Sequence, residues 1–189
     1  MRPNSNLRVV GTPRRSLFDA VRPATVQAAG ERLRGPGGMA LAALQHDGVT
    51  GGAHTPADSV VIGGRAFGSP REGWLQVEED RALAVAYGIA VTRLRRTAGG
   101  RTWCLLRSKA FTQGRTLEAA SVVGLLEPVR LIPVVVGPAD GVSRISWLLE
   151  SFGIAVQQAD NDDAWSLLSA LDHTARQADT GAAAVVAGR

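Results

Sequence analysis

The sequence predicts an α/β protein in which helices flank a mainly parallel sheet. From about Asp80 onward, segments with helical periodicity alternate with short apolar runs rich in β-branched residues, which is the pattern of βαβ units. The run at 102–106 is apolar almost throughout, as a strand covered on both faces is. Glycines at 99–100 and at 153 stand where helices are expected to end. Together these observations predict one sheet with crossover helices.

The second part of the chain contains a regular series of expected elements. Helices are expected at 83–94, 116–126, 143–151 and 163–177, and strands at 102–106, 131–136, 154–158 and 182–187. Pro133 is unusual for a central strand, because it cannot donate to the ladder. Residues 137–141 are expected to be the loop beyond that strand, where doubly wound sheets bind ligands. Ser143 is expected to cap the next helix, and Asp160 or Asn161 the last one.

The first 80 residues are less regular and rich in Gly, Pro and Arg. One or two helices are expected at 16–34, a short helical piece at 39–45, a loop at 47–57 and a strand at 59–62. We expect residues 1–13 to form a flexible arm. Residues 14–189 are expected to form a single domain, because 189 residues with 45% hydrophobic content suffice for one core but not for two large ones.

Composition excludes several classes of protein. The formal net charge is +4, but no basic run is interleaved with aromatic residues, so no nucleic-acid partner is expected. The only cysteine, Cys104, lies in an apolar strand, which predicts a buried thiol and no disulfide framework. No stretch resembles a secretory signal or is long and apolar enough to span a membrane. We therefore expect a soluble, cytoplasmic protein.

Residues 101–120 are similar to the diphosphate-binding segment of transketolases, which are thiamine diphosphate enzymes. Where that family has Gly-Asp-Gly after a strand, this chain has Arg107-Ser108-Lys109, followed by Gln113-Gly114 and Glu118-Ala119. Further similarities are found at 81–90, at Phe152-Gly153 and at 160–165, with a weaker one at 35–38. The resemblance covers roughly residues 58–189 and implies a three-layer thiamine-diphosphate-binding-like fold.

The same resemblance implies that the family's metal ligands are lost. The family holds Mg²⁺ through the Asp of Gly-Asp-Gly, a later Asn and a backbone carbonyl. By position, that Asp becomes Ser108, and the later Asp-x-Asn becomes Gly137-Pro138-Ala139, with Asp140 one residue out of register. Mg²⁺ requires hard oxygen ligands, which Arg107 and Lys109 cannot supply. No metal site is expected, and no thiamine diphosphate bound by this chain alone.

Other positions that face the cofactor in the family have also changed. The family's Lys-Gly-His-Ala turn becomes Gly63-Gly64-Arg65-Ala66, and its glycine-rich loop becomes the acidic run 77–82. Carboxylates in that run would repel a diphosphate. Asn161 stands at the place of a late histidine, and the histidine expected between Gly35 and Pro36 is absent.

Five residues outline a vestigial or repurposed diphosphate pocket: Arg65, Arg107, Ser108, Lys109 and Gln113. In one interpretation, the ammonium of Lys109, the only lysine, replaces the metal and holds a phosphate group together with Arg65. In the other, which we favour, Arg107 and Lys109 form salt bridges with Glu78, Glu79 or Asp80 and close the pocket. No catalytic residue is expected.

The remaining polar candidates lack a chemical context. Glu118 has no partner that would make it a general base, so a helix surface or a subunit contact is expected. His46, His54 and His173 show no metal-ligand spacing.

Three functions fit these residues. The first is a degenerate diphosphate-domain subunit of a two-component transketolase-like enzyme, which needs a partner chain carrying the pyrimidine domain. The second is a catalytic subunit in which Arg107 and Lys109 replace Mg²⁺ during two-carbon ketol transfer, with thiamine diphosphate bound in the complex. The third is a non-catalytic homodimer that binds anions or regulates another protein.

Overall fold

The structure is a computed structural model that describes residues 17–32, 38–50, 58–65, 67, 73–96, 99–125 and 129–188. The arm expected at 1–13 and most of the weaker similarity at 35–38 lie outside these residues. Of the loop expected at 47–57, residues 51–57 also lie outside them, whereas 47–50 belong to a helix, so that part of the prediction is wrong. No helix in the described ranges is both long and apolar enough to cross a membrane.

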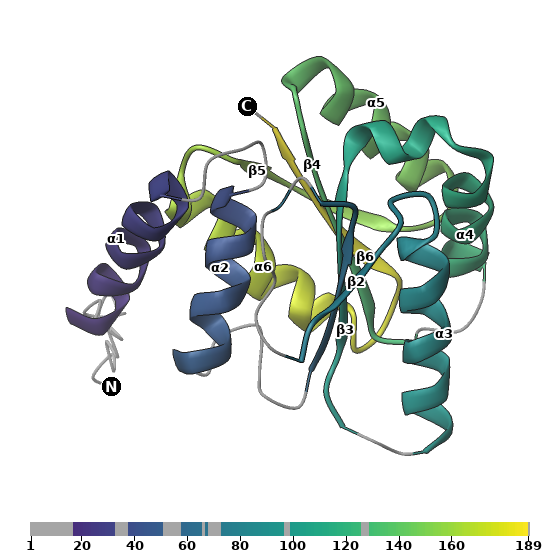
Figure 1. The fold of residues 1–189 in the computed structure, drawn as a ribbon, viewed down its shortest axis with the longest axis horizontal. Coiled ribbons are helices and arrows are strands. Elements are labelled where there is room, and N and C mark those ends of the chain that lie inside the picture. The colour runs from purple at the N-terminus through teal and green to yellow at the C-terminus, as the bar shows by residue number, and fades with distance from the viewer. Residues whose placement is uncertain are drawn as a thin grey trace, which may run out of the picture.

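A six-stranded sheet forms the centre of the fold, and all of its described strands run parallel (Figure 1). The strand order is β2-β1-β3-β4-β6-β5. The strands are β1 (Ser59–Gly63), β2 (Leu75–Val77), β3 (Thr102–Arg107), β4 (Leu131–Gly137), β5 (Ala155–Asp160) and β6 (Ala183–Gly188). This arrangement confirms the predicted α/β fold class.

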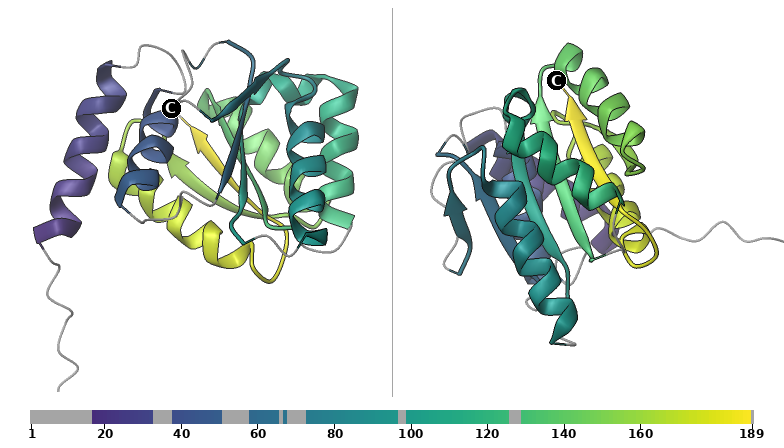
Figure 2. Two further views of the ribbon diagram at one scale, coloured as in Figure 1. Left: turned by 60° about the horizontal axis from the view of Figure 1, so that its bottom comes forward. Right: turned by 90° about the vertical axis from the view of Figure 1, so that its right-hand side faces the viewer.

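Helices cover both faces of the sheet, which makes three layers. The helices are α1 (Leu17–Arg32), α2 (Gly38–Thr50), α3 (Ala82–Arg95), α4 (Gly114–Leu125), α5 (Ala139–Ser151) and α6 (Ala164–Gln177). One apolar core contains residues of α1, α2 and α6, and the other contains residues of α3, α4 and α5. Alternate strand residues enter the two cores, as Ile62 and Val61 do. Figure 2 shows α1 on the outer side of α2.

Two short elements were not predicted. Strand β2 escaped notice because it has only three residues and none is buried, so no hydrophobic pattern marks it. A single 3-10 turn, η1 (Ser108–Thr112), follows β3 and holds Ala110 and Phe111 in the core. The turn places Ser108 and Lys109 at the carboxyl edge of the sheet.

One helix start and one helix cap differ from the sequence-based expectation. Helix α5 begins at Ala139 after Pro138, so residues 139–141 are its first turn and not a loop, and Ser143 is not its cap. Helix α6 is capped by Asp163, whose Oδ1 accepts a hydrogen bond of 3.0 Å from the backbone N–H of Trp165. Polar residues are frequent at both junctions, so composition did not identify the capping position.

Pro133 does lie inside β4, where its partner in β3 is Cys104. The ladder between β4 and β6 begins only at Val134. Pro133 therefore stands beyond the end of one ladder, which explains how a central strand tolerates it.

Candidate functional site at the carboxyl edge of the sheet

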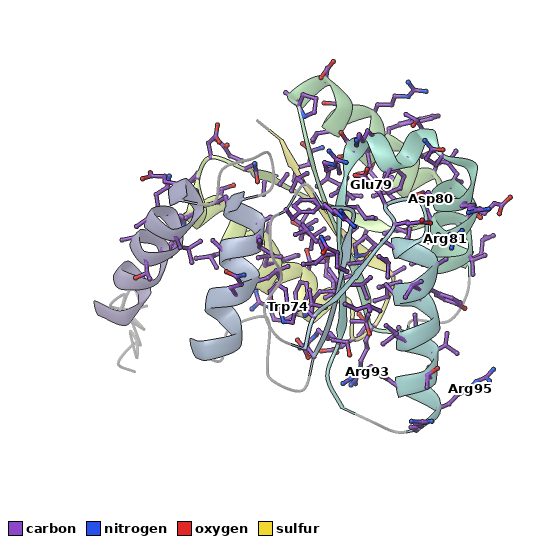
Figure 3. The ribbon with its side chains drawn as sticks, viewed as in Figure 1. Trp74, Glu79, Asp80, Arg81, Arg93 and Arg95 are labelled. Carbon is purple, nitrogen blue, oxygen red and sulfur yellow. The ribbon has the colours of Figure 1, made fainter. Side chains whose placement is uncertain are left out.

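The candidate residues gather where β1, β3 and β4 end, next to the start of α3. Parallel strands place their carboxyl ends at one edge of the sheet, which is where folds of this type usually bind ligands. Figure 3 shows Glu79, Asp80 and Arg81 at this end of α3, with Arg95 at its opposite end. The acidic run therefore faces the residues that follow β3.

Glu79 lies between two cations and is bonded to both. Its Oε1 and Oε2 accept hydrogen bonds of 2.6 Å from Nε and Nη2 of Arg107, which is a bidentate pair. The Nζ of Lys109 lies 3.5 Å from Oε2. The side chain of Glu79 is only 18% exposed, whereas that of Lys109 is 60% exposed. The salt-bridge interpretation is thus what the geometry shows for Arg107 and Lys109.

The neighbouring carboxylates also have cationic partners. Oδ2 of Asp80 lies 3.2 Å from Nη1 of Arg115, and Oε2 of Glu78 lies 3.1 Å from Nε of Arg81. The hydroxyl of Thr116 donates to the backbone carbonyl of Asp80 at 3.4 Å. The role of Arg115 was missed, because nothing in a sequence links a helix start to a loop 35 residues earlier. The acidic run therefore forms several ion pairs at this edge.

Ser108 fills the place to which the resemblance assigns a metal ligand. A Cβ atom added to Gly137 would lie 2.2 Å from Oγ and 2.6 Å from Cβ of Ser108. One added to Gly141 would lie 3.3 Å from the same Oγ. All three distances are shorter than ordinary van der Waals contacts, so Ser108 packs closely against the end of β4 and the first turn of α5. The gap between them cannot hold a larger side chain without movement.

The residues at this edge do not fit a magnesium ion with a diphosphate. Of the positions matched to family ligands, Ser108 carries a hydroxyl and Gly137 and Ala139 carry no polar side chain. Oδ1 of Asp140 accepts a hydrogen bond of 2.9 Å from the backbone N–H of Gly141, which uses it within the first turn of α5. Across the described residues, no three His, Cys, Asp or Glu side chains are grouped as metal ligands. None of the matched positions supplies the carboxylate oxygen that Mg²⁺ prefers, and the carboxylates of Glu79 and Asp80 at this edge are paired with arginines.

Different members of the predicted pocket line two separate surface hollows. Lys109 and Gln113 line a hollow of about 350 Å³ together with Glu79, Asp80 and Thr112. Arg65 lines another, of about 610 Å³, with Gln76, Val77, Glu78 and Arg81. All five predicted residues lie near one edge of the sheet, but these two hollows of the described residues separate Arg65 from Lys109 and Gln113. A phosphate held jointly by Lys109 and Arg65 has no support in this arrangement.

The remaining candidates lie elsewhere or outside the described residues. Cys104 is buried, and its burial raises the pKa of the thiol well above its usual value, so it is an unreactive core residue as expected. Glu118 is exposed on α4. His173 lies on α6, on the other side of the sheet. His54 is outside the described residues, and the side chain of His46 is not described.

No protein-family model matches the sequence, and no curated protein is similar to it. Solved structures do share the fold. A transketolase mutant from Pichia stipitis in complex with fructose-6-phosphate has a TM-score of 0.59 at 17% identity, over 89% of this chain and 34% of that one. Transketolase from Campylobacter jejuni has a TM-score of 0.58 at 15% identity, over 89% of this chain and 36% of that one.

A third structure extends the comparison beyond transketolases. A protein from Mycobacterium smegmatis, provisionally assigned as a thiamin diphosphate-dependent enzyme, has a TM-score of 0.52 at 16% identity, covering 71% of this chain and 29% of that one. The fold is therefore that of the thiamine-diphosphate-binding region of transketolases, as the sequence predicted. The chain spans about a third of the length of the transketolases that it matches.

Proposed function

We propose that this chain is a diphosphate-domain subunit of a two-component transketolase-like assembly and that it binds no magnesium or thiamine diphosphate by itself. The observation that carries the proposal is the ion cluster formed by Arg107, Glu79 and Lys109 at the carboxyl edge of the sheet. It lies at the positions that the sequence resemblance matches to the diphosphate site of transketolases. The partner supplies the pyrimidine domain.

The geometry of the cluster supports a structural role for it. Arg107 is held by both oxygens of a largely buried carboxylate, so freeing it for a ligand would leave Glu79 without its strongest partner. The cations at this edge are already paired with Glu78, Glu79 and Asp80, so a diphosphate would have to compete with these carboxylates for them. The close contact between Ser108 and Gly137 leaves little room for an ion between β3 and β4.

Calorimetry tests the lost cofactor site. Thiamine diphosphate and Mg²⁺ are titrated together into the full chain, with a transketolase as positive control and inorganic pyrophosphate as a second ligand. We expect no heat of binding at micromolar ligand. Micromolar affinity of the chain alone for thiamine diphosphate would overturn the proposal.

Co-purification tests the partner. The chain is expressed with a transketolase-like chain that carries a pyrimidine domain, the first choice being one encoded beside it. A stable complex is expected, and the cofactor is then titrated into that complex. Failure of every such chain to bind would contradict the two-component assembly while leaving the result for the cofactor site intact.

The alternative of metal-free ketol transfer has one observation in its favour. Lys109 is the least constrained member of the cluster, since its Nζ is 3.5 Å from Glu79 and it lines a hollow with Gln113. If the ammonium holds the diphosphate in the complex, Lys109→Ala abolishes transfer of a two-carbon unit and Lys109→Arg retains part of it. Unchanged activity in Lys109→Ala removes this alternative. An anion-binding homodimer has less support, because Glu79 and Asp80 line the same hollow.

A further inference from the structure

Strand β5 is an open edge of the sheet, at the opposite end of the strand order from β2. The N–H of Ala155 donates to Ala182 and that of Asn161 to Gly188, which shows that the odd-numbered residues face β6. The backbone groups of the even-numbered residues therefore point away from the sheet. Asp160 bonds there to the hydroxyl of Ser166 at 3.0 Å. Among the described residues, nothing bonds the outward N–H groups of Val156 and Gln158.

This edge lacks the features that normally prevent two edges from pairing. It is six residues long and contains no proline, and its only charge is Asp160 at the end. The other edge strand, β2, has three residues and is followed directly by Glu78. A short edge next to a charge resists pairing, whereas a longer neutral one favours it.

A groove runs beside the open edge. It has a volume of about 420 Å³ and lies between β5 and α6, with Gln157, Gln158, Trp165, Ser169 and His173 in its lining. Trp165 is 43% exposed, which is unusual for so large an apolar side chain. The edge thus combines unpaired backbone groups with an accessible aromatic ring.

We propose that β5 pairs antiparallel with β5 of a second copy of this chain, about a twofold axis through Gln157. In this register Val156 faces Gln158 of the second copy and Gln158 faces its Val156. Each of these two pairs exchanges two N–H···O=C bonds, so four bonds use the outward groups of Val156 and Gln158. Asp160 keeps its bond to Ser166. A twofold axis makes the same surface serve both copies.

The side chains suit this register. Ala155 faces Ala159, and Gln157 faces its own counterpart, so no bulky pair meets across the axis. Asp160 faces Ile154, which avoids a pair of like charges. The charges at the two ends also suit a twofold pairing, because β5 leads into the acidic turn at 160–163 and α6, which runs back along β5, has the exposed Arg176 in its last turn. The sequence of the edge is thus self-complementary.

The inference goes beyond the proposed function and does not depend on it. In the sheet, β4 and β6 separate β5 from β3, so the paired edge leaves the carboxyl-edge cluster accessible. A homodimer through β5 can therefore bind a further partner at the candidate site. Loss of one interaction need not affect the other.

Light scattering coupled to gel filtration, over a range of concentrations, measures whether the full chain has twice the mass of one copy. We expect a dimer that Gln158→Pro converts to a monomer, because proline removes the outward donor and blocks the approach of the second strand. The fold tolerates proline there, since that N–H makes no bond within the sheet. The matched control, Gln158→Ala, keeps the backbone donor and is expected to stay dimeric.

Cysteine cross-linking tests the register independently of proline. Residues opposite each other in a non-hydrogen-bonded antiparallel pair have Cα atoms about 4.5 Å apart, within reach of a disulfide. Gln157→Cys should therefore cross-link on mild oxidation, and Gln158→Cys should not, because its counterpart is offset along the strand. A monomeric wild-type chain, a dimer unaffected by Gln158→Pro, or equal cross-linking of both cysteine variants overturns the inference.

Discussion

The ion cluster of Arg107, Glu79 and Lys109 at the carboxyl edge differs from the β5 edge in whether its polar groups have partners within the chain. At the cluster, Glu79 accepts hydrogen bonds from Arg107 and lies close to Lys109, all within one chain. At the β5 edge, backbone donors of Val156 and Gln158 have no partner in the described part of the chain. A polar group satisfied internally stabilises the fold, whereas an exposed row of unsatisfied backbone groups is available to another chain. The region matched to a cofactor site is therefore the more closed of the two.

The largest effect is expected from Gly137→Ala. Its new Cβ would lie 2.6 Å from the Cβ of Ser108, so backbone must move, and overpacking of this kind costs about 1–3 kcal/mol. Urea denaturation measures the loss in the free energy of unfolding. In a Ser108→Gly background the same substitution should cost much less, because the obstructing atoms are gone. Equal costs in both backgrounds would show that the carboxyl edge is less tightly closed than the structure indicates.

A smaller loss is expected from Glu79→Gln. The amide cannot maintain charge-assisted bonds to Arg107 and Lys109, and removing one partner of a partly buried pair should cost about 1–2 kcal/mol, below the value for full burial. Glu78→Gln is the matched control: its pair with Arg81 is exposed on both sides and is expected to contribute less than about 1 kcal/mol. The melting temperatures of both variants, measured by thermal unfolding, show which substitution destabilises the protein more. If they are equal, Glu79 is not the centre of the cluster.

The smallest effect is expected at the β5 side, from Asp163→Ala. This substitution removes the cap of α6, which typically costs about 1 kcal/mol. Asp162→Ala is the comparison, because Asp162 stands one residue before the cap. Both variants should keep the dimer mass, since the paired backbone of β5 is untouched and each removes only one of the acidic side chains of the turn at 160–163. Loss of the dimer in Asp163→Ala but not in Asp162→Ala would show that the interface is formed by the start of α6 and not by strand β5.

Fold elements were predictable where residue type and burial agree. The runs at 102–106 and 131–136 identified β3 and β4, because buried parallel strands need apolar residues on both faces. Strand β2 was missed because its residues are exposed. The start of α5 was missed because Pro138, Asp140 and Ser143 are all plausible beside a helix start, and only the backbone decides among them.

The sequence predicted which types of residue form the candidate site, but not which acidic residue pairs with which cation. Its composition indicated that the metal ligands are replaced and that Arg107 and Lys109 have acidic neighbours to pair with. Three acidic residues in a row gave no means to choose Glu79 as the shared partner or to assign Asp80 to Arg115. That choice depends on how α3 is placed against β3 and α4.

From the sequence we could infer the α/β class, the strands of the buried centre and, through the resemblance to transketolases, the loss of metal-binding side chains at the matched positions. These follow from residue type and spacing, which are local properties of the chain. Three-dimensional packing was needed to show that Ser108 lies against Gly137, that Arg65 and Lys109 line different hollows of the described residues, and that β5 is an open edge. Each of these depends on distances between segments far apart in the chain, and such distances arise only when the sheet and helices pack.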